Sequence, residues 1–249
     1  PRLAKFIHGM TPRAKKPDDD MTLDVIDVSD TVSLRVFRPV GVVGPVPALL
    51  WMHGGGHLFG SPEQDDRSNM AFARDLGIVV AAVRYRLGMD ASAPASVEDC
   101  YAALEYLGEN AGELGIDSAR IAVGGASAGG GVAAALALYA HDRGKHPIAF
   151  QLLVYPMLDD RTVTRPELDK MPVRMWTTKS NRLGWSTYLA GEPGAADVSP
   201  YAAPARRSDL SGLPPAWVGV GSLDLFHDED VDYAHRLKAA GVGCTLNVV

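Results

Sequence analysis

Cysteine is scarce in this sequence, which contains only Cys100 and Cys244. Neither residue belongs to a CxxC pair or to a His/Cys cluster with zinc-finger spacing, so no structural zinc site is indicated. We expect two buried free thiols. So few cysteines fit a reducing compartment, and we therefore expect a cytoplasmic location.

Long apolar runs and an excess of basic residues are also lacking. No stretch approaches the ~18 consecutive apolar residues of a membrane span, so we expect no stable membrane insertion. Residues 1–10 contain no apolar run that ends in small residues, and we expect no secretory signal there. The formal net charge of −6 provides no basic face for phosphates, which argues against nucleic acid as a partner.

What the sequence does have is an alternation of short apolar runs and helical stretches. The apolar runs are near-continuous, as in strands buried on both faces of a sheet, and they cover 48–52, 78–83, 121–123, 150–154, 216–220 and 245–249. Helical spacing appears between them, over 70–76, 97–104, 129–139 and 229–240. Ser96 and Asp99 have the spacing of a capping box at the start of the second helix. Repeated strand, helix and strand require right-handed crossovers, so we predict one three-layer α/β sandwich with a mostly parallel sheet.

Two parts of the chain depart from this alternation. The β-rich runs 23–28 and 33–37 predict an N-terminal antiparallel hairpin. Residues 157–215 contain no convincing strand and far exceed an ordinary loop. Because Trp176 and Trp185 give this insertion apolar surface, we predict a helical lid. A structural excursion without a functional role stays open as the alternative.

The segment Gly125-Ala126-Ser127-Ala128-Gly129 fits the GxSxG pattern of a serine nucleophile. It follows the predicted strand 121–123 and precedes an alanine-rich helix, which is the context that this pattern requires. The serine must occupy a very tight turn, and small flanking residues let strand and helix approach each other. We therefore predict Ser127 as the nucleophile; the alternative is a glycine-rich turn that only closes the helix onto the sheet.

A glycine-rich run, His53-Gly54-Gly55-Gly56, comes directly after the predicted strand 48–52. Backbone N–H groups in such a loop can stabilise the oxyanion of a tetrahedral intermediate. We predict this role for the N–H groups of Gly55, Gly56 and Ala128. An ordinary flexible turn is the competing interpretation.

His53 and His57 are four residues apart, but the glycines between them disfavour the helix that would place both on one face of a metal site. We therefore predict no metal and no other cofactor. We expect His53 to hold the glycine loop through a hydrogen bond. His57, Leu58 and Tyr155 are predicted to line the substrate pocket.

A serine nucleophile needs a histidine to take its proton and a carboxylate to orient that histidine. In this type of sheet the chain order is serine, acid, histidine, and the acid should follow the strand 216–220. Asp224 occupies that place. Asp228 and Glu229 are the fallback, although negative charge there also suits the start of the next helix.

The histidine is expected after the strand 245–249, where the printed chain ends. His227 and His235 do not match the chain order, so neither is favoured as the base. We therefore expect the 249-residue chain as printed to hydrolyse its substrate poorly, because losing the base costs orders of magnitude in rate.

Together, HGGG at 53–56, GASAGG at 125–130 and GSLDLFHDE at 221–229 resemble the hormone-sensitive-lipase-like family of esterases, with similarity from about Val36 to Val249. The resemblance implies an α/β-hydrolase fold without cofactors and an acyl-enzyme mechanism on short- to medium-chain acyl esters. It also implies that residues 1–20 are a remnant of an N-terminal cap and that a C-terminal loop and helix are absent. Family members usually have aspartate before the nucleophile, where this chain has Ala126.

Two functions stay open on the sequence alone. One is a serine ester hydrolase acting on a small-molecule ester. The other is a non-catalytic small-molecule-binding protein on the same fold, as in the gibberellin receptors, which resemble this family without a working histidine. Because residues 245–249 would form a sheet edge, pairing of two copies into a homodimer is a further hypothesis.

Overall fold

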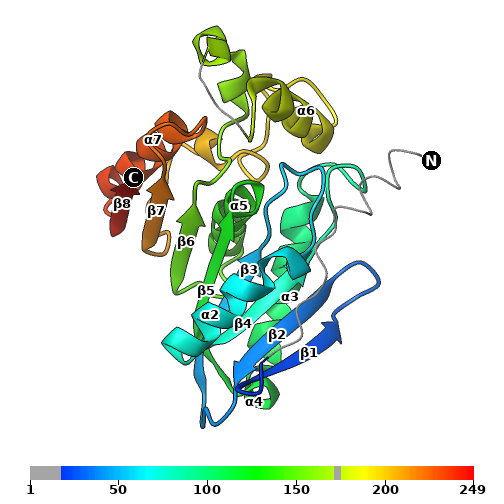
Figure 1. Ribbon diagram of the computed structural model, residues 1–249. Helices are drawn as coiled ribbons and strands as arrows, with labels where there is room; N and C mark the ends of the chain where they lie inside the picture. Colours follow the sequence, from blue (N-terminus) through cyan, green and yellow to red (C-terminus); the bar gives the residue numbers. More distant parts are fainter. Residues whose placement is uncertain (1–17, 171–174) are drawn as a thin grey trace, which may run out of the picture.

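The computed structural model describes residues 18–170 and 175–249, and its elements alternate between strand and helix (Figure 1). The strands are β1 Met21–Asp27, β2 Ser33–Pro39, β3 Val46–Met52, β4 Val79–Arg84, β5 Ile116–Ala126, β6 Phe150–Val154, β7 Ala216–Val220 and β8 Cys244–Val248. The α-helices are α2 Asp66–Leu76, α3 Ala95–Glu109, α4 Ala111–Leu114, α5 Ala128–Arg143, α6 Thr178–Leu189 and α7 His227–Ala239. Short 3-10 helices are η1 Pro62–Asp65, η2 Asp160–Thr164, η3 Pro166–Lys170 and η4 Pro204–Arg206.

The eight strands form one sheet in the order β1-β2-β4-β3-β5-β6-β7-β8. β1 and β2 form an antiparallel hairpin, and β2 is also antiparallel to β4. Every pairing from β4 across to β8 is parallel. The prediction of a mostly parallel sheet with an N-terminal antiparallel hairpin is therefore confirmed.

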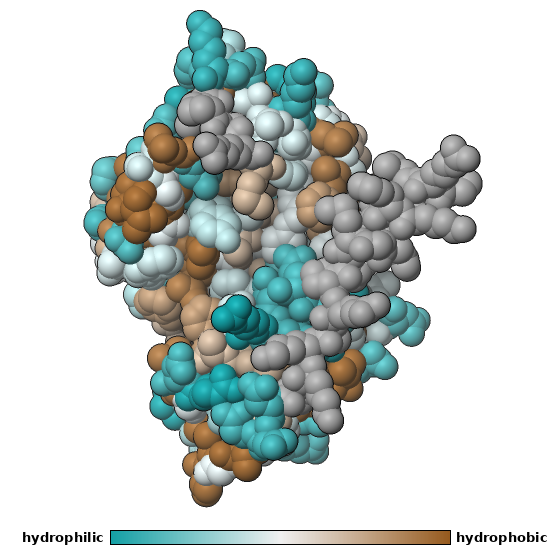
Figure 2. Space-filling view, in the orientation of Figure 1, coloured by the Kyte–Doolittle hydropathy of each residue, from teal (hydrophilic) through white to brown (hydrophobic). Residues whose placement is uncertain are grey.

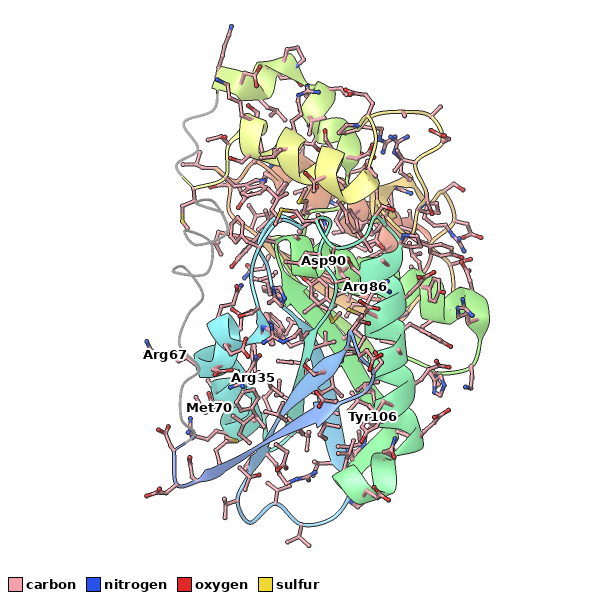
Figure 3. The ribbon with its side chains drawn as sticks, turned by 90° about the vertical axis from the view of Figure 1, so that its right-hand side faces the viewer. Arg35, Arg67, Met70, Arg86, Asp90 and Tyr106 are labelled. Atoms are coloured by element: carbon pink, nitrogen blue, oxygen red, sulfur yellow. The ribbon has the colours of Figure 1, made fainter. Side chains whose placement is uncertain are left out.

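Helices cover both faces of the sheet, as the three-layer prediction requires. Met70 of α2 packs with Leu49 and Trp51 on one face. Leu104 of α3 and Leu136 of α5 pack into the larger core on the other face. Figure 3 shows α2, which carries the labelled Met70, and α3, which carries the labelled Tyr106, on opposite sides of the sheet. Since α5 is rich in alanine, it can lie close to the strands along almost its whole length.

The described residues of the segment 157–215 contain α6 and three 3-10 helices but no strand. This segment lies beyond the carboxyl ends of the parallel strands (Figure 1). Its fully buried side chains Trp185 and Tyr188 pack in one apolar cluster with Ala128, at the start of α5, and with Phe226, after β7. The helical character agrees with the sequence prediction, whereas the role as a lid stays a prediction. The predicted cap remnant lies almost wholly outside the described residues.

Two local predictions are wrong. Ser96 and Asp99 do not form a capping box, because both side chains bind Arg86 instead: the Ser96 hydroxyl donates to Arg86 O at 2.8 Å, and Asp99 Oδ1 accepts from Arg86 Nη2 at 2.7 Å. The pair therefore ties α3 to the segment that follows β4. Cys244 is only half-buried, since β8 is at the sheet edge, whereas Cys100 is buried as expected.

The edge strand β8 pairs with β7, and its other side is not paired with any strand of the described residues. Figure 2 shows apolar residues at the surface beside this edge, where Val248 and Val249 are 42% and 79% exposed. Homodimer formation through this edge stays a prediction. None of the helices in the described part of the chain combines the length and hydropathy that crossing a bilayer requires.

Candidate active site

Ser127 forms the turn between β5 and α5, with φ 57° and ψ −123°. This backbone conformation is unfavourable for a residue with a side chain, so it must be held by its surroundings. The Ser127 N–H donates to Val154 O at 2.9 Å, and Ser127 O accepts from the N–H of Met157 at 2.9 Å. The side chain makes no capping hydrogen bond to α5. Its hydroxyl therefore sits on a turn whose backbone is fixed by the neighbouring strand β6 and the segment after it.

The glycines around Ser127 are required by close backbone approach. A Cβ atom on Gly129 would lie 2.2 Å from Met52 O, and one on Gly125 would lie 2.4 Å from Gly129 O. A side chain at either position would push the end of β3, the end of β5 and the start of α5 apart. The GxSxG spacing thus reflects the packing that holds the turn.

The glycine-rich loop lies directly against this turn. A Cβ atom on Gly54 would be 3.4 Å from Ser127 Cβ. Gly55 and Gly56 have φ values of 132° and 60°, which glycine adopts without strain. The loop is closed by the N–H of Phe59, which donates to Gly55 O at 3.2 Å. The structure thus brings the two glycine-rich motifs together.

Three backbone N–H groups of the two motifs are candidates for binding an oxyanion. The N–H groups of Gly55, Gly56 and Ala128 donate to no backbone acceptor in residues 18–170 or 175–249. Ala128 is in the first turn of α5, where helical N–H groups have no partner within the helix and carry partial positive charge. These are the groups predicted to bind an oxyanion, and that role remains a prediction.

Asp224 lies in the turn that follows β7. Its N–H donates to Gly221 O at 3.0 Å, and its Oδ1 accepts from the Phe226 N–H at 2.9 Å. Phe226 belongs to the same buried cluster as Ala128, so one apolar cluster joins this turn to the start of α5. The geometry is compatible with Asp224 as the acid, an assignment that stays a prediction.

The fallback acids have other partners. Asp228 is exposed and binds His227 Nδ1 at 2.9 Å and Arg165 Nη2 at 2.8 Å. Glu229 is buried, and its Oε1 accepts from the Leu158 N–H at 2.7 Å. Leu158 follows the residue that donates to Ser127 O, so Glu229 braces the backbone beside the nucleophile from α7. An acidic residue near a helix start normally suggests an exposed position, and nothing in the local sequence indicated this buried contact.

Burial raises the pKa of Glu229 to about 8, against the lowering effect of hydrogen bonds from Thr162 and Leu158. Since the pKa of Glu229 in the folded protein lies above its ordinary value of 4.5, this group's contribution to stability is complete below pH 4.5 and is lost as the pH rises through 8. Glu229→Gln keeps the acceptor oxygen without the titration. We expect the melting temperature of the variant to fall less than that of the wild type between about pH 5 and pH 9.

Differential scanning calorimetry across this pH range measures the effect. Glu113→Gln, at an exposed position, is the matched control and should keep the wild-type slope. If wild type and Glu229→Gln lose stability in parallel, the buried carboxyl does not titrate as described.

The histidines of the described residues do not hydrogen-bond to Ser127 or Asp224. His53 Nδ1 donates to Gly54 O at 2.9 Å, which is the loop-holding contact expected from the sequence. Burial lowers the pKa of His53 to about 4, so its ring is neutral near pH 7. His227 binds Asp228. In addition, no group of three or more His, Cys, Asp and Glu side chains within the described ranges is placed to hold a metal ion.

The predicted pocket residues differ in exposure. His57 is buried, at 3% exposure, Leu58 is half-buried, and Tyr155 is 42% exposed. Tyr155 follows β6, and its N–H donates to Gly219 O at 2.6 Å. Burial raises the pKa of Tyr155, and the charges of Asp65 and Asp224 add to this effect. The substrate-binding roles of all three residues stay predictions.

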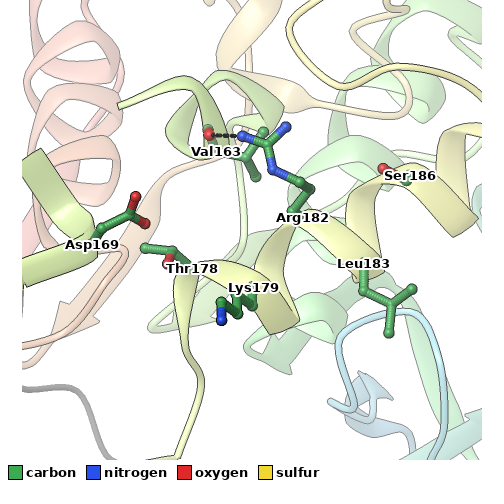
Figure 4. Close-up of a pocket in the computed structure, with 7 residues that line it drawn as sticks. All are labelled: Val163, Asp169, Thr178, Lys179, Arg182, Leu183 and Ser186. Atoms are coloured by element: carbon green, nitrogen blue, oxygen red, sulfur yellow. Dashed lines mark hydrogen bonds between the residues drawn. The ribbon is translucent and has the colours of Figure 1, made fainter. Parts of the chain in front are cut away.

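A pocket of about 620 Å³ lies along α6 and does not include any predicted site residue (Figure 4). It is lined by Val163, Asp169, Thr178, Lys179, Arg182, Leu183 and Ser186. Arg182 crosses it and donates to Val163 O at 2.6 Å. The pocket is therefore a feature of the 157–215 segment and is distinct from the serine elbow.

The chain is similar to several proteins that are named as esterases or ester hydrolases. The family model described as the alpha/beta hydrolase fold matches residues 49–249. Carboxylesterase NlhH of Mycobacterium tuberculosis is 37% identical over 223 residues, which are 87% of this chain and 68% of that protein. Ethyl acetate hydrolase of Pseudomonas putida is 32% identical over 244 residues, 95% of this chain and 75% of that protein. The structure named bacterial heroin esterase has a TM-score of 0.89 and 43% identity, covering 99% of this chain and 80% of that chain.

Proposed function

Because this chain belongs to the alpha/beta hydrolase fold family and its relatives are esterases, we propose that it is a serine carboxylic ester hydrolase for short- to medium-chain acyl esters. The observation that carries the proposal is a serine on a strained strand-to-helix turn beside a glycine loop whose Gly55 and Gly56 N–H groups donate to no backbone acceptor of the described residues. The comparisons favour this function over a non-catalytic binding protein.

In the proposed mechanism, the Ser127 hydroxyl attacks the acyl carbonyl while a histidine accepts its proton. The negative oxygen of the tetrahedral intermediate is held by the N–H groups of Gly55, Gly56 and Ala128. The histidine then protonates the leaving alcohol, and an ester bond between the acyl group and Ser127 remains. Water, activated by the same histidine, cleaves this bond and releases the carboxylic acid. No cofactor takes part.

Asp224 is proposed to orient this histidine and to stabilise its protonated form. We propose a histidine outside the described residues as this base, because His53 and His227 bind Gly54 O and Asp228 instead. The sharing of one buried cluster by the nucleophile turn and the acid turn supports this arrangement, because it fixes their relative positions.

Trp176 supports the preference for short acyl chains. A Cβ atom on Gly56 would lie 1.9 Å from Trp176 Cη2, so the indole closes the space directly beside the glycine loop. A wall at this point leaves little room for a long chain. We propose that the 157–215 segment is a lid and that Leu58 and Tyr155 line the pocket beneath it.

A series of p-nitrophenyl esters tests the proposed activity. We expect kcat/KM to be highest between acetate and octanoate and at least about 10-fold lower for palmitate, the size of effect that pocket fit provides. The assay uses protein that includes the proposed histidine base. The Ser127→Ala variant of the same protein gives the background rate. Fastest hydrolysis of palmitate would contradict the chain-length proposal, and equal rates for wild type and variant would contradict the esterase proposal itself.

We further propose a cytoplasmic location and a homodimer. Free Cys100 and Cys244 support a reducing compartment, and the exposed edge of β8 supports strand pairing between two copies. A monomeric mass by light scattering at micromolar concentrations would count against the dimer.

A further inference from the structure

Helix α6 packs closely against the glycine loop. A Cβ atom on Gly184 of α6 would lie 2.6 Å from Gly56 O, so only glycine lets the helix approach the loop this closely. The Trp176 ring contacts Gly56 from the same segment. Trp176 is itself fixed, because its Nε1 donates at 3.1 Å to Oδ1 of the fully buried Asn181. Gly56 is therefore in contact with two residues of the 157–215 segment.

His57 is the next residue in the loop, and its ring packs against two aromatic rings of α6. Its ring lies parallel to the ring of Tyr188, with centroids 3.8 Å apart and an interplanar angle of 2°. The Trp185 ring is 5.6 Å away. His57 has a φ of 62°, and its carbonyl accepts from the N–H of Gly88 at 2.9 Å. Stacking thus holds a residue whose own backbone conformation is unfavourable.

The His57 ring is held by packing alone. Within the described residues, both ring nitrogens are buried and without a hydrogen-bond partner, as is Trp185 Nε1. Burial lowers the pKa of His57 to about 3, so the ring is neutral near pH 7. At 3% exposure it offers almost no surface to a substrate. Neither charge nor hydrogen bonding accounts for the buried position of the His57 ring, whereas stacking on Tyr188 does.

We infer that His57 is a positioning residue: stacked on Tyr188, it fixes the backbone of Gly55 and Gly56 so that their N–H groups point at the developing oxyanion. This inference rests on the proposed function and replaces direct substrate contact as the role of His57. It makes α6 a structural support of the oxyanion site in addition to its proposed role as a lid. Misplaced donors stabilise the transition state less and leave substrate binding nearly unchanged.

A double-mutant cycle tests the inference. Tyr188→Leu removes the stacked ring, and Tyr188→Phe keeps it, so the two variants separate the effect of the ring from that of the hydroxyl beside Ser96. His57→Asn removes the other ring while tolerating positive φ. We expect Tyr188→Leu and His57→Asn each to lower kcat for p-nitrophenyl butyrate by about 10-fold with KM within about twofold. The double variant should lose little more than either single variant.

Hydrogen exchange gives a readout that does not depend on turnover. The Leu58 and Phe59 amides donate to Gly55 O at 3.0 and 3.2 Å, so their exchange reports on the loop. We expect faster exchange in Tyr188→Leu and His57→Asn and wild-type exchange in Tyr188→Phe. Unchanged exchange in both ring-deletion variants would overturn the inference, as would a raised KM with unchanged kcat in His57→Asn. Background rates in wild-type protein that includes the proposed histidine base would instead refute the proposed function, and exchange alone would then decide the role of His57.

Discussion

In protein that includes the proposed histidine base, replacing Ser127 with alanine is expected to lower kcat for p-nitrophenyl butyrate by about 10⁵-fold. The hydroxyl is the atom that forms the acyl-enzyme, so its loss removes the covalent route entirely. The remaining rate comes from the N–H groups of the glycine loop and from substrate binding, which still act on direct attack by water. Initial rates at saturating ester, corrected for spontaneous hydrolysis, measure the effect.

The fold should survive this substitution. The Ser127 side chain makes no capping bond to α5, and alanine can adopt the same backbone turn, so we expect a change in unfolding free energy within about 0.5 kcal/mol. Ser118→Ala, at an exposed position in β5, is the control and should keep full activity. Retention of more than about a tenth of the rate by folded Ser127→Ala would remove Ser127 from the mechanism.

Asp224→Asn is expected to have the next largest effect, a loss of about 10³- to 10⁴-fold in kcat. An amide cannot stabilise the protonated histidine as a carboxylate does, and it favours the wrong orientation of the ring. The side-chain oxygen of asparagine can still accept from the Phe226 N–H, so the turn should keep its shape. The comparison of kcat with the melting temperature separates lost chemistry from lost folding.

Asp228→Asn is the matched control for the acid. Asp228 is four residues from Asp224 but pairs with Arg165 and His227 at the surface, so its replacement should change kcat by less than about twofold. A larger loss in Asp228→Asn than in Asp224→Asn would show that the acid has been assigned to the wrong turn.

Much of the fold could be predicted because its signals are local. Strands β3, β4 and β7 are buried on both faces and therefore read as continuous apolar runs. The glycines of residues 125–129 also indicate close packing, since Gly129 lies so near Met52 O that a side chain would not fit. By contrast, β5 begins at Ile116, before the apolar run, and its exposed residues 118–120 give no pattern that distinguishes strand from loop.

The missed features depend on partners that are distant in sequence. Ser96 and Asp99 have the spacing of a helix cap, but Arg86 takes both side chains. Glu229 reaches the backbone at Leu158, 71 residues away, and nothing around either residue specifies the other. The stacking of His57 on Tyr188 is of the same kind. Residue type and spacing predict which groups are candidates for the chemistry, whereas tertiary contacts decide what holds those groups in place.

The central claim is that the Ser127 hydroxyl is the nucleophile. The most direct measurement is covalent labelling with a fluorophosphonate of protein that includes the proposed histidine base, followed by peptide mass spectrometry. We predict a single adduct on the peptide that contains Ser127, absent in Ser127→Ala and formed more slowly in Asp224→Asn. An adduct on another residue, or no adduct on the folded protein, would contradict the account.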